Sequence, residues 1–309
     1  MRPMRGIGLK VVSVVVFIAM ASLIKAVGER VPPGEVVFFR SFFALPVILV
    51  WLTLRREMPA GLRTQNPLGH LWRGFAGTMA MGLGFAGLAL LPLPEVTAIG
   101  YAAPLLTVVF AAMFLGEQVR AFRLIAVVVG LAGVLIVLSP RLGAFGSESD
   151  AEGVRATLGA IVVLGGAVFN ALAQVFVRKL VATERTSTIV FYFSLTASGL
   201  ALLTLPFGWV VPAAGDAALL ILAGLLGGVG QIFLTASYRE ADASVVAPFE
   251  YVSILFALAI GFAVFDEVPT PTMLAGAGIV IAAGIAIIWR ERQLGIERAR
   301  QRQAMTPQG

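Results

Sequence analysis

The residue of this sequence that most clearly points to a chemical function is an acidic side chain inside a long apolar run. Glu250 lies within the mostly apolar run from 243 to 265. A carboxylate surrounded by hydrocarbon is costly unless a cation, a bound ligand or a proton neutralises it. We therefore predict that Glu250 binds a ligand or exchanges a proton. A structural ion pair or a water-exposed position is the alternative.

Two tyrosines offer a flat surface for a ligand. Tyr101 and Tyr251 lie 150 residues apart in similar apolar runs. An aromatic pair can stack on a planar molecule or present hydroxyl groups to its polar edge, and it can equally well serve helix packing. Both interpretations stay open on the sequence.

Amide and guanidinium side chains also occur in apolar surroundings. Asn170 and Gln174 are one helical turn apart, and Gln231 and Arg40 lie in other apolar runs. Amides can bind a polar ligand or hydrogen-bond neighbouring helices, whereas Arg40 can bind an anion or extend toward an interface. The predicted binding residues are therefore Glu250, Tyr101, Tyr251, Asn170, Gln174, Gln231 and Arg40.

Prolines and acidic residues near helix ends are expected to shape or gate the structure rather than to bind a ligand. Pro104 and Pro248 each interrupt an apolar run, where proline permits a bend and frees a backbone carbonyl. Glu117 and Glu267 each follow an apolar run, again 150 residues apart. We predict gating or packing roles for both.

The composition indicates that lipid surrounds most of this chain. Of its 309 residues, 59% are hydrophobic and 13% are charged, against roughly 25% charged in typical globular domains. The net charge of +6 comes in short clusters between apolar runs, which argues against nucleic-acid binding. The chain has no cysteine, a single histidine, His70, expected in a loop or at an interface, and no phosphate-binding loop. We expect no metal site, no cofactor and no enzymatic active site.

Ten segments are long enough to cross a membrane, since a crossing helix needs about 20 mostly apolar residues. They are residues 8–26, 35–54, 72–92, 95–115, 122–138, 156–178, 188–206, 214–237, 243–265 and 272–290. Eighteen of the 23 Lys and Arg residues fall on one side of this arrangement. The predicted fold is thus an all-α inner-membrane protein with both termini in the cytoplasm. A linker at 139–155 and a basic tail at 291–309, disordered or lying on the surface, complete the chain.

The two halves of the chain repeat each other. An offset of 150 residues pairs Gly74 with Gly224, Gly77 with Gly227, Tyr101 with Tyr251 and Glu117 with Glu267. A repeat with an odd number of crossings inserts in opposite senses, so residues 8–138 and 156–290 are predicted to be inverted five-helix repeats. Inverted repeats are typical of carriers that hold a substrate near the midplane, where the two halves meet.

With these residues in place, the sequence resembles a known family. The runs that carry the resemblance are Leu115-Gly116-Glu117 with Gly130 and Gly133, Phe265-Asp266-Glu267 with Gly276 and Gly284, and the prolines Pro104 and Pro248. They resemble the paired EamA domains of the drug/metabolite transporter superfamily over residues 8–290. Asp266 departs from this pattern, because it stands where the first repeat has Gly116.

Further short segments resemble one branch of that superfamily. This branch includes riboflavin and S-adenosylmethionine uptake carriers and some metallophore exporters. The segments are Phe39-Arg40-Ser41, Leu71-Trp72-Arg73-Gly74 and Ala247-Pro248-Phe249-Glu250-Tyr251. The resemblance implies a ten-helix secondary transporter whose central cavity is lined by helices of both repeats.

We therefore expect a secondary carrier that moves a small organic metabolite through the bilayer by alternating access. A riboflavin-like molecule is the first candidate substrate, and proton coupling through Glu250 is a candidate energy source. The alternatives are an S-adenosylmethionine or amino-acid-like solute carrier, a metabolite exporter and a lipid-linked flippase.

Overall fold

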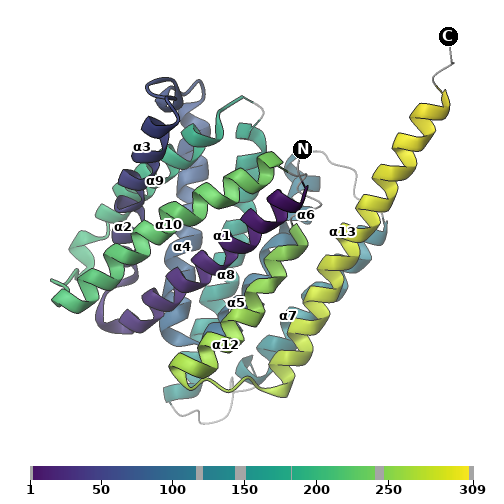
Figure 1. Cartoon of the computed structure of the whole chain (residues 1–309). Helices are drawn as coiled ribbons and strands as arrows, with labels where there is room; N and C mark the ends of the chain where they lie inside the picture. Colours follow the sequence, from purple (N-terminus) through teal and green to yellow (C-terminus); the bar gives the residue numbers. More distant parts are fainter. Residues whose placement is uncertain (1–2, 116–120, 143–150, 182, 241–246, 306–309) are drawn as a thin grey trace.

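The computed structural model describes residues 3–115, 121–142, 151–181, 183–240 and 247–305, which form helices and connecting segments without a strand (Figure 1). The first half contains α1 (Pro3–Val27), α2 (Pro33–Phe42), α3 (Ala44–Leu54), α4 (Pro67–Leu90), α5 (Leu93–Gly100), α6 (Ala102–Leu115) and α7 (Ala121–Leu142). The second half contains α8 (Ala151–Val181), α9 (Thr186–Leu202), α10 (Ala214–Glu240), α12 (Ser253–Phe265) and α13 (Pro271–Met305). Short 3-10 helices are η1 (Gly28–Arg30), η2 (Ala60–Leu62), η3 (Leu205–Phe207) and η4 (Ala247–Val252).

Seven helical stretches in the described ranges are long and apolar enough to cross a membrane. They are Met4–Arg30, Pro33–Leu54, Leu93–Phe114, Ala121–Pro140, Gly153–Val177, Ala214–Leu234 and Pro271–Arg290. Two shorter apolar helices, Ser187–Leu202 and Phe249–Phe265, lie at the seventh and ninth predicted crossings, and α4 lies at the third. The chain is therefore a multi-pass, all-helical membrane protein.

Proline breaks two of the predicted crossings into two helices each. One break follows Phe42, between α2 and α3, and the other follows Gly100, between α5 and α6. Pro46 lies four residues after Phe42, and Pro104 lies four residues after Gly100. In a continuous helix, a proline ring clashes with the carbonyl group four residues before it, so each helix ends at that earlier residue. The fourth crossing, expected as one helix over 95–115, is thus a pair of helices joined at Tyr101.

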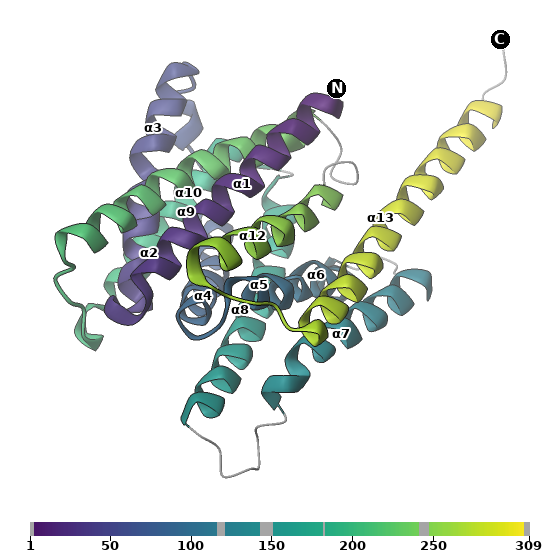
Figure 2. The same cartoon turned by 60° about the horizontal axis from the view of Figure 1, so that its bottom comes forward.

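The helix contacts come in matched pairs. α1 packs along α10, and α4 packs along α8; α2 contacts α10, and α9 contacts α4. α7 and α13 pack against each other beside the rest of the bundle (Figures 1 and 2). Exchanging the first five predicted crossings for the last five converts the first contact of each pair into the second, and it converts the contact between α7 and α13 into itself.

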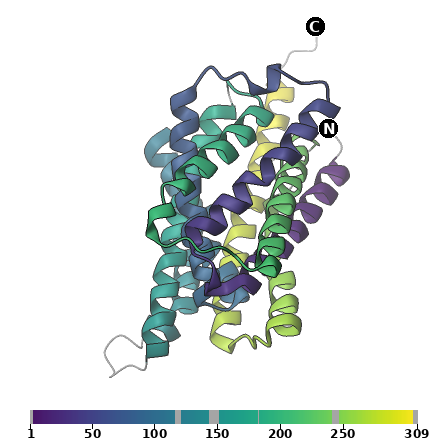
Figure 3. The same cartoon turned by 90° about the vertical axis from the view of Figure 1, so that its left-hand side faces the viewer.

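The C-terminal segment differs from the expected loose tail. α13 continues to Met305 and extends well past the neighbouring helices (Figure 1). Apart from one glycine, residues 291–305 are Glu, Arg, Gln, Leu, Ile, Ala and Met, most of which favour helix. The last turns of α13 lie toward the same end of the bundle as the first turns of α1 (Figure 3).

Candidate functional site

A cavity of about 340 Å³ lies among helices of both halves of the chain. Residues of α1, α2, α4 and α5 line it from the first half, and residues of α8, α9 and α10 from the second. Four of the predicted binding residues line this cavity: Arg40, Asn170, Gln174 and Gln231. Polar side chains from distant parts of the sequence thus converge on one hollow.

Arg73 also lines the cavity, although the sequence analysis did not select it. The predicted crossing 72–92 placed Arg73 at its cytoplasmic end, where it was counted among the basic residues that set the orientation. α4 instead begins at Pro67, which places Arg73 in the second turn of the helix. The proline at the first helical position was the sequence signal for this earlier start.

An aromatic ring and two glycines position the guanidinium groups. The Cζ atoms of Arg73 and Arg40 lie 3.6 Å and 5.6 Å from the ring centroid of Phe193, within the range of cation–π attraction. A Cβ atom at Gly77 would collide with Arg73 Nη1, and one at Gly227 would lie 3.1 Å from Arg40 Nε. The two glycines therefore leave the space that the guanidinium groups occupy.

The tyrosines predicted to flank a planar ligand contact each other instead of lining the cavity. Tyr101 and Tyr251 are buried, with ring centroids 5.0 Å apart in an edge-to-face arrangement. The Tyr101 hydroxyl lies 2.5 Å from Ser253 Oγ. The pair joins the break between α5 and α6 to the start of α12.

Glu250 also lies outside the cavity lining. Its Oε2 accepts a hydrogen bond of 2.7 Å from Lys10 Nζ, and this ion pair connects η4 to α1. The Lys10 side chain is 2% exposed, whereas that of Glu250 is 55% exposed. Pro248 lies in the same 3-10 helix, η4.

A second ion pair lies behind one end of the cavity. Lys25 Nζ is 2.8 Å from Glu267 Oε1, and it donates hydrogen bonds to the carbonyl oxygens of Leu91 and Leu88 at 2.8 and 3.3 Å. Glu267 Oε2 accepts from the backbone N–H of Leu93 at 2.9 Å. Leu88 and Leu93 line the cavity, so this pair joins α1, α4, α5 and α12 at that end. Glu117, the predicted counterpart of Glu267, lies outside the described residues.

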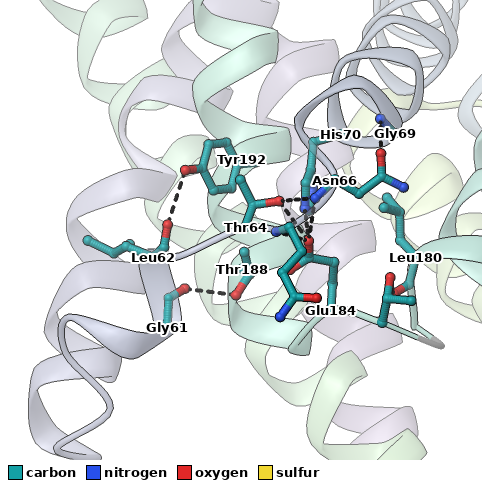
Figure 4. A network of polar contacts seen from close by, with 12 residues as sticks. Gly61, Leu62, Thr64, Asn66, Gly69, His70, Leu180, Glu184, Thr188 and Tyr192 are labelled. Atoms are coloured by element: carbon teal, nitrogen blue, oxygen red, sulfur yellow. Dashed lines mark hydrogen bonds and ion pairs between the residues drawn. The ribbon is translucent and has the colours of Figure 1, made fainter.

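A polar network connects the loop before α4 with the loop before α9 (Figure 4). Glu184 Oε1 accepts hydrogen bonds from Thr64 Oγ1 at 2.7 Å and from the backbone N–H groups of Gln65 and Asn66 at 2.7 and 3.0 Å. Burial acts to raise the pKa of Glu184, but these hydrogen bonds and the nearby His70 outweigh it, so the pKa lies below its usual range.

His70 is buried in that network rather than exposed in a loop. Its side chain is 2% exposed, its Nε2 lies 3.7 Å from Glu184 Oε1, and its ring centroid is 4.9 Å from that of Tyr192. The early start of α4 explains the difference, because it brings residue 70 into the helix. Among the described residues, no three His, Asp or Glu side chains form a group that could hold a metal ion.

A bundle of apolar helices around a polar cavity, reached by residues of both halves, defines a multi-pass membrane protein of the transporter class. The model of the EamA-like transporter family matches residues 4–139 and again 157–290. The chain belongs to the EamA-like transporter family, and it is a transporter rather than an enzyme.

Several transporters are similar to this chain over most of their length. The pseudopaline exporter of Pseudomonas aeruginosa is 33% identical, covering 91% of this chain and 95% of its own. The riboflavin transporter of Rhizobium johnstonii is 31% identical, covering 84% and 82%. The S-adenosylmethionine uptake transporter of Rickettsia felis is 27% identical, covering 93% and 94%. One crystal structure matches with a TM-score of 0.65 over 95% of this chain and 99% of its own; at 20% identity it shows the fold alone.

Proposed function

We propose that this chain is a secondary transporter that carries a small polar organic metabolite across the inner membrane, with the 340 Å³ cavity as its substrate site. The convergence of Arg40, Arg73 and three amide side chains on that cavity carries the proposal. Ionisable groups inside a membrane bundle face its interior or a water-filled cavity and mark substrate pathways. Family membership supports the same function.

Two observations support an architecture of ten crossings in two inverted repeats. The helix contacts exchange with one another when the halves are exchanged, as a pseudo-twofold axis requires. The family model also matches the chain twice, at 4–139 and 157–290. A substrate site between two such halves suits alternating access, in which the halves rock around a fixed site.

The exposure of the cavity residues suggests which end of the site is open. Asn170 and Gln174 line the cavity and are exposed. At the opposite end Leu88 and Leu93 are buried and backed by the pair of Lys25 and Glu267. With the N-terminus in the cytoplasm, the structure corresponds to a carrier open to the cytoplasm and closed to the outside.

The cavity itself is the better guide to the substrate than the tyrosines. A riboflavin-like substrate was the first candidate after the family resemblance, and Tyr101 and Tyr251 were expected either to stack on a planar molecule or to pack between helices. The two rings instead pack on each other outside the cavity lining. Guanidinium and amide groups favour a substrate rich in hydrogen-bond acceptors, such as an amino-acid-like solute, while the similarity to riboflavin and S-adenosylmethionine transporters keeps both molecules in the test panel.

Transport by purified protein in liposomes tests the proposal. The panel contains riboflavin, S-adenosylmethionine, glutamate, glutarate and citrate, each assayed for exchange with and without a proton gradient. Gly84 lines the cavity, and a Cβ atom there would meet open space, so Gly84→Phe should fill the site and abolish exchange. Gly199→Phe is the matched control, because Gly199 is an exposed glycine of α9 with equal room. Equal rates for the wild type and Gly84→Phe for every solute would contradict the proposal.

A further inference from the structure

Two guanidinium groups reach the cavity without an acidic partner among the residues that the structure describes. The Nε and Nη1 atoms of Arg40 and Arg73 are buried and form no hydrogen bond to any residue that the structure describes. Arg40 is only 3% exposed, and the described residues that line the cavity include no Asp or Glu. The two positive charges also act on each other. Buried like charges without a counterion are costly, so the arrangement calls for an anion from outside the chain.

Neither loss of a proton nor contact with an aromatic ring can replace an anion beside these two positive charges. Arginine keeps its proton in proteins, so the groups do not become neutral by losing it. The ring of Phe193 attracts both cations, but its side chain has no oxygen or nitrogen acceptor for the N–H donors. The buried Nε and Nη1 donors of both groups therefore still lack acceptors among the described residues.

We propose that Arg40 and Arg73 bind a carboxylate of the transported substrate, so that the substrate class is a small organic carboxylate. This inference rests on the proposed transport function and names the substrate class of that site. A carboxylate presents two coplanar oxygens that match the guanidinium fork and accept two parallel hydrogen bonds. Asn170, Gln174 and Gln231 supply further donors and acceptors for the rest of the molecule. A cavity of about 340 Å³ lies in the range of sites for small organic ligands.

Calorimetric titration of the purified full chain in detergent tests the site directly. The probes are citrate and glutarate, with the uncharged diamide glutaramide and inorganic phosphate as comparisons. Arg40→Gln and Arg73→Gln should each weaken carboxylate binding by about 10- to 100-fold, the range for hydrogen bonds to charged groups. Arg63→Gln, at an exposed loop arginine, should leave the affinity within about twofold. Arg40→Lys keeps the charge but loses the fork, so it should also bind more weakly than the wild type.

Thermal unfolding without ligand separates a binding role from a structural one. If the two arginines have no counterion until an anion binds, Arg40→Gln removes an uncompensated buried charge and should raise the melting temperature. An arginine that holds the fold together would give a fall instead. Added citrate should raise the melting temperature of the wild type and not that of the Gln variants.

Four results would overturn the inference: no carboxylate probe binds, both Gln variants bind as the wild type does, glutaramide binds as tightly as glutarate, or phosphate binds more tightly than citrate. Failure of the transport proposal looks different. If citrate binds in an arginine-dependent way but is not exchanged in liposomes, the transport proposal is wrong and the carboxylate site stands. If the wild type and both Gln variants exchange riboflavin, the transport proposal stands and the carboxylate site is wrong.

Discussion

Lys25 and Glu267 form an ion pair of 2.8 Å that joins the last turns of α1 to the residues just after α12. Their side chains are 12% and 13% exposed, and both also bond the backbone at the junction of α4 and α5. Four helices therefore meet at this pair, which lies behind the end of the cavity that Leu88 and Leu93 line.

We predict that Lys25→Ala opens the outer end of the cavity. Removing one partner of a buried pair costs about 3–5 kcal/mol, and this cost falls on the outward-closed state. Because the chain has no cysteine, Thr97→Cys places a single thiol at the cavity lining. An impermeant thiol reagent should label that thiol faster from outside when Lys25 is replaced.

Arg30→Ala is the control for this experiment. Arg30 pairs with Asp216 at 2.8 Å, also near the end of α1, but its side chain is 59% exposed. An exposed pair contributes little to stability, so labelling at Thr97→Cys should stay at the wild-type rate. Equal labelling in the Lys25 and Arg30 variants would show that Lys25 does not hold the end closed.

Glu250→Gln should insert normally and lose gradient-driven accumulation while exchange without a gradient survives. The change removes the carboxylate charge beside Lys10 and retains the shape of the side chain. Glu240→Gln is the control, because Glu240 pairs with Arg5 at 3.3 Å between α10 and α1. Wild-type accumulation and exchange in the Glu250 variant, from about pH 5 to 8, would make the Lys10 pair a structural contact.

Gly284→Ala should destabilise the protein by about 1–3 kcal/mol, the usual cost of overpacking. A Cβ atom at Gly284 would collide with the Tyr251 hydroxyl, whereas one at Gly278 on the same helix would meet open space. Gly278→Ala should therefore be neutral or stabilising by up to about 1 kcal/mol. Melting temperatures of the two variants in detergent provide the measurement. Similar values for both would mean that Tyr251 can move away from α13.

The contact that Glu184 makes between the loop before α4 and the loop before α9 should depend on pH. A carboxylate with a lowered pKa stabilises its contacts above its ordinary pKa of about 4.3 and loses this contribution as the pH falls through its folded-state value. Hydrogen exchange of residues 64–66 should stay slow near neutral pH, and protection should fall only below about pH 4.

Glu184→Ala should remove that protection at neutral pH, at a cost of about 1–3 kcal/mol for the lost acceptor. Glu57→Ala is the comparison, because Glu57 lies in the loop before α4 and its side chain makes no hydrogen bond or ion pair within the described residues. The same loss of protection in both variants would count against a specific role for Glu184.

Reporter fusions should place both ends of the chain in the cytoplasm. A fusion after Trp289 is expected on the cytoplasmic side, and a fusion within 146–150 on the periplasmic side, because most Lys and Arg residues lie on one side of the ten-crossing arrangement. Reporters on the same side would contradict the inverted repeats.

Much of the cavity lining was predictable because a polar side chain in an apolar run is unusual wherever it occurs. Arg40, Asn170, Gln174 and Gln231 were selected on that basis, and all four line the cavity. Arg73 was missed because the expected crossing placed it at the cytoplasmic end, where a basic residue indicates orientation, whereas α4 begins five residues earlier, at Pro67. The two tyrosines could not be assigned, since their spacing does not reveal whether two rings face a ligand or each other.

By itself, the sequence determined that lipid surrounds most of the chain and that the chain is helical and crosses the membrane several times. These properties depend on local composition, because the cost of placing a side chain in hydrocarbon is set largely by that side chain. Only the tertiary structure decided which polar groups have partners. Lys10 and Glu250 are 240 residues apart in the sequence, yet they pair. Arg40 and Arg73 instead meet at the ring of Phe193, with no acidic partner in the described part of the chain. Pairing depends on distances between side chains of different helices, and packing alone sets those distances.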